Sequence, residues 1–134
     1  MKNLYLRLLI PLLYISAIAQ SLPAQTPEPN KKPKQFIYVL HPVPRLYDDK
    51  AWTAEDKAAV DRHLANFKAA VQSGQLILAG RTREPADKTF GIAVFEAADE
   101  AAAREFMEAD PAIAAGVMTA ELHPFSVVLQ RKNP

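Results

Sequence analysis

Residues 60–79, VDRHLANFKAAVQSGQLILA, decide the fold, because they join a helix to a strand through one glycine. The large apolar residues of the first half recur at spacings of four, three and four, which places them on one stripe of an α-helix. They are Val60, Leu64, Phe67 and Val71. Gly74 supplies a left-handed stop for this helix. The apolar run Leu76–Ala79 then predicts a strand.

The residues before this segment predict a strand, a loop and the start of the helix. FIYVL at 36–40 is rich in β-branched and aromatic residues and is typical of a buried strand. Residues 41–52 carry two prolines and paired aspartates, which favour an irregular loop. A loop this long is either functional or a plain surface excursion. Thr53, with Asp56 three residues later, resembles a capping box at the helix start.

The residues after this segment repeat the pattern. A polar connection at 80–88 precedes a third strand at 89–95. A second helix is predicted at 100–108, with Asp99 as its cap, and it ends at Asp110 because the residue before a proline avoids the helical region. Residues 112–117 form a short turn that Gly116 ends, and the last strand is predicted within 121–129.

The predicted order is strand, helix, strand, strand, helix, strand. This is the α+β ferredoxin-like βαββαβ fold, with an antiparallel four-stranded sheet and two helices on one face. The other face of the sheet also carries large residues. A domain of about 95 residues is expected to bury such a face by pairing, so we predict a homodimer.

The N-terminus predicts export. Lys2 and Arg7 precede a 12-residue apolar run, Leu8–Ala19, that ends in Ala-Ile-Ala, which is a signal-peptide pattern. An uncleaved anchor is the weaker interpretation, because a membrane span needs about 20 apolar residues. Cleavage is predicted after Ala19, with Ala24 as the alternative. The organisation is then a signal peptide at 1–19, a Pro-rich linker at 20–35, a domain at 36–129 and a tail at 130–134, in a periplasmic or secreted protein without a membrane segment.

Composition excludes several classes of function. The chain has no cysteine, which excludes disulfides and thiolate chemistry. Without residues 1–19 it has 14 basic and 15 acidic residues, so nucleic acid is not an expected partner. No phosphate loop, nucleophile elbow or dinucleotide motif is present, and no cofactor is predicted. The three histidines, His41, His63 and His123, lack the tight spacing of a zinc site, so no metal is predicted.

His63 and Asp110 are the candidate catalytic residues. His63 lies roughly 70° from the centre of the apolar stripe of its helix, which suits a half-buried side chain. A nearby carboxylate fixes the tautomer of such an imidazole and raises its basicity. The topology brings Asp110 to the same edge of the domain. The alternative is structural, with His63 a polar residue at the helix edge and Asp110 a helix terminator. Four further residues at this edge are candidate substrate-binding groups: His41, Arg45, Arg81 and His123.

Two blocks resemble the YCII (YciI-like) family. RHLANFKAAVQSGQLILAGRT at 62–82 is similar to the family pattern of a helical histidine, a glycine-ended helix and a strand ending in Ala-Gly. EAADEAAAREFMEADPAIAAGV at 96–117 is similar to the second block, with its acidic-Pro pair. The resemblance covers residues 36–129. It implies a dimeric α/β barrel and a His and Asp pair in a pocket, roles that fall on His63 and Asp110.

Three hypotheses about function follow. The first is a small-molecule lyase or isomerase-type enzyme in which His63, oriented by Asp110, transfers a proton. The second is a small-molecule binding domain that uses the same pocket without turnover. The third is a structural dimeric module in which the pair only joins the helices.

Overall fold

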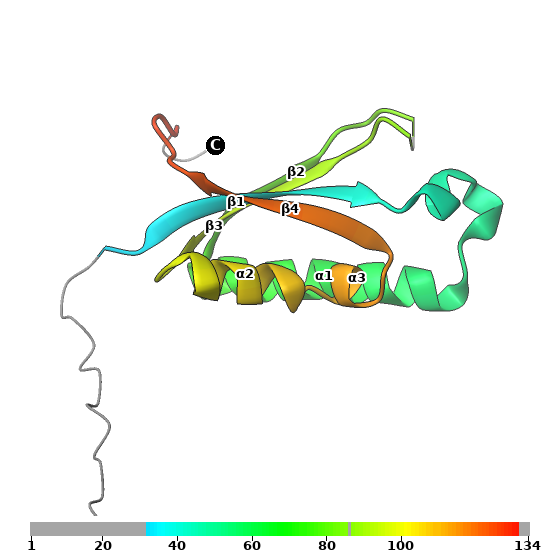
Figure 1. Cartoon of the computed structure of the whole chain (residues 1–134), viewed down its shortest axis with the longest axis horizontal. Helices are drawn as coiled ribbons and strands as arrows, with labels where there is room; N and C mark the ends of the chain where they lie inside the picture. Colours follow the sequence, from blue (N-terminus) through cyan, green and yellow to red (C-terminus); the bar gives the residue numbers. More distant parts are fainter. Residues whose placement is uncertain (1–31, 86, 132–134) are drawn as a thin grey trace, which may run out of the picture.

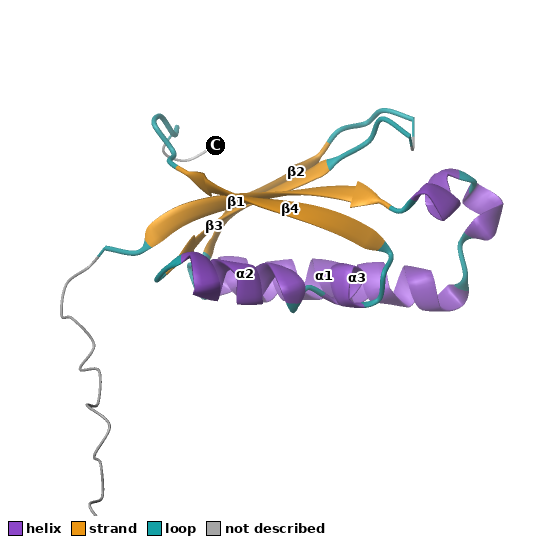
Figure 2. Ribbon diagram, in the orientation of Figure 1, coloured by secondary structure: helices purple, strands orange, loops and turns teal. Residues whose placement is uncertain are grey.

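The computed structural model describes residues 32–85 and 87–131 (Figure 1). The predicted signal peptide and residues 20–31 of the predicted linker lie outside these residues. The described part forms one layer of helices against one sheet, with the elements in the predicted βαββαβ order (Figure 2). None of the helices in the two described ranges is long and apolar enough to cross a membrane.

The sheet is antiparallel, with the strand order β2-β3-β1-β4. The strands are β1 (Lys34–Pro42), β2 (Leu76–Arg81), β3 (Gly91–Ala97) and β4 (Met118–Phe125). β1 and β3 occupy the centre because each pairs with a strand on both sides. This arrangement confirms the ferredoxin-like fold.

Helices α1 (Ala54–Gln72) and α2 (Glu100–Glu108) cover one face of the sheet, together with the short α3 (Pro111–Ala114) (Figure 2). The predicted capping box is confirmed, since the Thr53 and Asp56 side chains each accept a hydrogen bond from the backbone N–H of the other. Asp99 caps α2 as predicted. The residues after Asp110 form a helical turn, α3, where the sequence predicted only a turn.

The buried face of α1 differs from the predicted stripe. Leu64 and Val71 are 51% and 55% exposed. The positions that are buried against the rest of the protein are Asp56, Ala59, Phe67 and Ala70. At about 100° per residue these four span an arc centred on His63, so His63 lies in the middle of the buried face and not at its border. The prediction failed because it weighted large residues, whereas alanines let the helix approach its neighbours closely.

Strand boundaries also differ from the prediction. β4 begins at Met118, three residues before the predicted range, because Gly116 turns the chain at a φ of 66° and the strand pairs with β1 from Met118 opposite Pro42. β1 begins two residues before Phe36, and β2 extends into the predicted polar connection as far as Arg81. The shift of β4 matters for the site, because it moves His123 away from the start of the strand.

The main core lies between the sheet and the helices. Alternate residues of β1, namely Phe36, Tyr38 and Leu40, face the helices and are buried. The Tyr38 ring packs edge-on to Phe95 at a centroid distance of 5.6 Å and lies 6.2 Å from Phe67. These aromatic contacts fix the position of the Tyr38 hydroxyl group beneath the helices.

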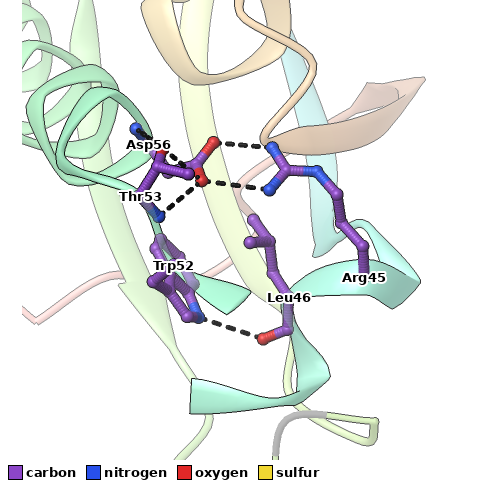
Figure 3. Close-up of polar contacts among 5 residues, drawn as sticks. All are labelled: Arg45, Leu46, Trp52, Thr53 and Asp56. Atoms are coloured by element: carbon purple, nitrogen blue, oxygen red, sulfur yellow. Dashed lines mark hydrogen bonds and ion pairs between the residues drawn. The ribbon is translucent and has the colours of Figure 1, made fainter. Parts of the chain in front are cut away.

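The segment after β1 is ordered by specific contacts and contains two 3-10 turns, Pro44–Tyr47 and Asp49–Ala51. Leu46 is 1% exposed and packs in a second small core with Ala59 and Val117. The Trp52 indole N–H donates to the Leu46 carbonyl at 3.1 Å. Arg45 binds the Asp56 carboxylate through both guanidinium nitrogens, at 2.6 and 3.0 Å, which ties the segment to the start of α1 (Figure 3).

The sheet face opposite the helices carries the alternate set of strand residues. Register places five apolar residues together in the middle of this face: Ile37, Val39, Leu78, Ile92 and Val94. The chain that follows β4 runs on this same side of the sheet (Figure 1), and its Val128 and Leu129 are 86% and 92% exposed.

Candidate functional site

His63 and Asp110 contact one another, as the sequence predicted. The His63 Nδ1 atom lies 2.7 Å from Asp110 Oδ2 and 2.9 Å from Oδ1. His63 comes from the middle of α1, whereas Asp110 is the residue that caps the start of α3. The topology therefore joins two positions that are 47 residues apart in the sequence. A charge-assisted contact of this kind holds the imidazole in one orientation.

Asp110 is fully buried, and its carboxylate has three partners. Besides His63, it accepts hydrogen bonds from the Tyr38 hydroxyl at 3.1 Å and from the Ala112 backbone N–H at 2.9 Å. Burial alone raises the pKa of Asp110, but the hydrogen bond and charge of His63, with the bonds from Ala112 and Tyr38, outweigh it and hold the pKa below its ordinary value. The carboxylate therefore stays ionised at neutral pH.

Tyr38 supports the pair from the sheet and was missed by the sequence prediction. Its ring is fully buried, and its pKa is raised well above the ordinary value, first by burial and then by the charge and hydrogen bond of Asp110. It therefore remains a neutral phenol that donates to Asp110. The only signal in the sequence was a tyrosine inside an otherwise apolar strand, where a buried hydroxyl needs a partner.

The Asp110 contact leaves the second nitrogen of the His63 ring open. An ionised carboxylate accepts a hydrogen bond from Nδ1–H, so the neutral ring carries its lone pair on Nε2. In the described residues Nε2 makes no hydrogen bond, and no side-chain nitrogen or oxygen there is both buried and unpaired. Nε2 is therefore accessible. Phe67 packs against the ring at a centroid distance of 4.2 Å.

His63 lines a cavity of about 450 Å³ between α1 and the helix-facing side of the sheet. This volume is within the range of small-molecule sites, roughly 300 to 1,000 Å³. Most of the wall is apolar, and it includes Leu40, Phe67, Phe90 and Met118. A mostly apolar cavity with one accessible imidazole nitrogen is suited to bind a small organic molecule and to exchange a proton with it.

Of the four predicted substrate-binding residues, the structure brings only Arg81 to this cavity. His41 and His123 lie on the opposite face of the sheet, because they alternate with the helix-facing residues of β1 and β4. Arg45 is held by Asp56 at the start of α1. The prediction placed the two histidines at one edge without assigning a face of the sheet, and a difference of one residue in a strand reverses the face.

No three His, Cys, Asp or Glu side chains gather closely enough to hold a metal ion within residues 32–85 and 87–131. The site therefore consists of the His63–Asp110 pair, the Tyr38 hydroxyl behind it and the apolar cavity in front of it.

The sequence of the domain matches a known family. A model of the YCII-related domain matches residues 42–126, which is more than half of the chain. The chain belongs to this family. The YCII match lies inside residues 36–129, for which the two sequence blocks predicted it, and it contains both His63 and Asp110. No curated protein matches the chain.

Solved structures similar to this YCII domain include two crystal structures of SnoaB, described as a cofactor-independent oxygenase from Streptomyces nogalater. One of them, of a mutant SnoaB, is 19% identical, covers 72% of this chain and 93% of its own, and has a TM-score of 0.38. A second SnoaB structure, determined to 1.9 resolution, is 22% identical to this chain. The match covers 75% of this chain and 98% of the SnoaB chain, and its TM-score is 0.35.

Proposed function

We propose that this chain is an exported YCII-domain protein that acts on a small organic molecule as a lyase or isomerase-type enzyme. His63 is the general base and acid, and Asp110 is the positioning residue that orients it. The observation that carries the proposal is the His63 ring itself, which is bound to a buried carboxylate on one side and open to an apolar cavity on the other.

The proposed reaction begins with proton transfer to His63. Nε2 takes a proton from an acidic C–H or O–H bond of the substrate, and the electron pair of that bond moves into an adjacent π-system. Asp110 stabilises the imidazolium that forms. The proton then returns to a second carbon, which completes an isomerisation, or to a departing group, which completes an elimination. Neither course needs an oxidant or a further reactant.

The structural alternative has an observation in its favour as well. Asp110 caps α3 and also binds the β1 residue Tyr38 and the α1 residue His63, so it connects three elements of the domain. A residue with this many partners can be retained for stability alone. The two functions differ in what they require of Nε2, because only the enzyme uses that nitrogen.

The test compares wild-type protein with His63→Gln. The glutamine amide can still donate to Asp110, so the variant keeps the connection between helices but lacks a base. Both proteins are incubated in D₂O with a small-molecule extract of the host, and the products are resolved by mass spectrometry. We expect wild-type protein alone to convert a compound, either to an isomer that carries deuterium or to a smaller product.

Two results would count against the enzyme. The first is an identical product pattern for wild-type protein and His63→Gln. The second is no conversion by either protein, together with a loss of stability in Asp110→Asn, which would assign the pair to the structural role.

A further inference from the structure

The position of Arg81 at the end of β2 carries an inference about the substrate. β2 pairs with β3 so that Arg81 lies opposite Gly91, and Gly91 in turn lies opposite Leu40 of β1. Directly opposed residues of antiparallel strands project to the same face. Leu40 faces the helices, so Arg81 is on the helix side of the sheet, the side on which His63 lies.

Gly91 leaves room beside Arg81. A methyl group at this position would lie 3.5 Å from the Leu40 side chain and 3.5 Å from the Gly80 carbonyl oxygen. Gly91 is itself part of the cavity wall. The missing side chain therefore leaves the cavity wall open next to Leu40.

Arg81 provides the fixed charge of the cavity. Among the residues that line it, the rest are apolar or uncharged except for His63. Within the described part of the chain, no carboxylate forms an ion pair with Arg81. An adjoining depression, which Arg81 also lines, contains Arg83 with Asp49 and Glu84. That depression contains two carboxylates, whereas no carboxylate lines the His63 cavity.

We propose that the molecule bound beside His63 has a small, ring-shaped apolar body and one carboxylate, and that Arg81 binds the carboxylate. This inference rests on the proposed function, because it describes the substrate of the same site. The guanidinium group binds a planar carboxylate through two parallel hydrogen bonds. The Phe67 ring, which packs against His63 at a centroid distance of 4.2 Å, suits a ring in the bound molecule, since aromatic faces and edges pack with defined geometry.

This arrangement also orients the substrate. A carboxylate held at Arg81 fixes one end of the molecule at the sheet, and the ring then extends through the apolar part of the cavity toward α1. Two anchors of different chemistry restrict the bound molecule to a small set of poses, which is what a single base such as His63 requires for proton transfer at one atom.

The experiment uses phenylacetate and its neutral amide, phenylacetamide, which share the same ring. Binding to the full mature protein is measured by NMR titration, with the Met118 methyl resonance as the reporter of the cavity. The variants are Arg81→Gln and, as the matched control, Arg83→Gln, which removes the same charge from the adjoining depression. His63→Gln is measured in parallel.

We expect phenylacetate to bind wild-type protein about tenfold more tightly than phenylacetamide, in keeping with a charge-assisted contact at a partly solvated site. Arg81→Gln should abolish this preference, and Arg83→Gln should keep it. Equal binding of the two probes, an equal loss in both arginine variants, or no response of the Met118 methyl group would overturn the proposal.

The His63→Gln variant separates this inference from the proposed function. If it binds phenylacetate as wild-type protein does, Arg81 recognises the carboxylate without help from the base. If that recognition holds but the wild-type protein converts no compound in D₂O, the enzyme proposal fails alone. If conversion depends on His63 but the two probes bind equally, the substrate inference fails alone.

Discussion

The chemistry of the site depends on which His63 nitrogen carries the proton. Asp110 accepts from Nδ1 at 2.7 Å, and the Tyr38 hydroxyl and the Ala112 N–H hold the carboxylate in place. A neutral ring in this setting has a free lone pair on Nε2, directed away from Asp110. Proton transfer to Nε2 depends on that tautomer.

Replacement of Asp110 by asparagine should reverse the tautomer. The amide NH₂ donates to Nδ1, so the ring proton moves to Nε2 and the base is lost. We expect Asp110→Asn to reduce turnover by about 100-fold or more, the typical scale of general base catalysis, and to lower the free energy of unfolding by roughly 1 to 3 kcal/mol. Urea unfolding and initial rates measure the two effects. Full turnover in a destabilised variant would assign Asp110 to stability only.

Acid should weaken the fold through Asp110. Its pKa is lower in the folded protein than in the unfolded chain, so its contribution to stability is complete above the unfolded value of about 4. That contribution decreases as the pH falls below this value toward the folded pKa. Urea unfolding at a series of pH values from neutral to below the unfolded pKa measures the slope. Asp110→Asn should show a shallower decline than wild-type protein, and an equal slope would contradict the assignment.

At the level of elements, the segment between β1 and α1 is held by one buried leucine and one ion pair. Leu46 fills a core formed by α1 and the chain before β4. Leu46→Ala should lower the free energy of unfolding by about 2 to 5 kcal/mol, because it removes a buried side chain and leaves a cavity. Val128→Ala is the matched control, since Val128 is 86% exposed and should change stability little. A small effect of Leu46→Ala would show that the segment is loosely packed.

The Arg45–Asp56 contact should matter more than an ordinary surface ion pair. It is bidentate, and the same carboxylate accepts from the Thr53 backbone and hydroxyl at the start of α1. We expect Arg45→Gln to lower the melting temperature and to speed hydrogen exchange at residues 43–52. Arg104→Gln breaks only the exposed pair with Glu100, which is 3.1 Å long, and should leave both unchanged. Equal behaviour of the two variants would contradict the role of Arg45.

Element order could be predicted from the sequence, but faces and boundaries could not. Gly74, the capping residues and the proline after Asp110 mark where helices start and stop, so the βαββαβ order and the proximity of His63 to Asp110 followed. The buried face of α1 could not be predicted in this way, because alanines that are almost fully buried contribute only weakly to a hydrophobic pattern. His41 and His123 were misplaced because their sheet face depends on register, and register depends on pairing partners far away in the sequence.

At the level of the whole molecule, the open face of the sheet predicts association. Of the five apolar residues named above, Val94 is already buried, and Ile37, Val39, Leu78 and Ile92 remain at least partly exposed. Burial of this patch against a second copy would form a two-sheet barrel. We expect the protein without residues 1–19 to sediment as a dimer at micromolar concentration. Val39→Glu, on this face, should give a monomer, whereas Val71→Glu, exposed on α1, should remain dimeric. A wild-type monomer would contradict the prediction.

The tautomer and accessibility of the His63 ring decide whether it can act as a base. They are measured by ¹⁵N NMR of the imidazole nitrogens at neutral pH, with and without phenylacetate. We expect a protonated Nδ1, an unprotonated Nε2 and a change in the Nε2 resonance when the probe enters the cavity. A proton on Nε2 of the neutral ring, or an Nε2 resonance that does not change when the probe binds, would contradict the assignment of His63 as the base.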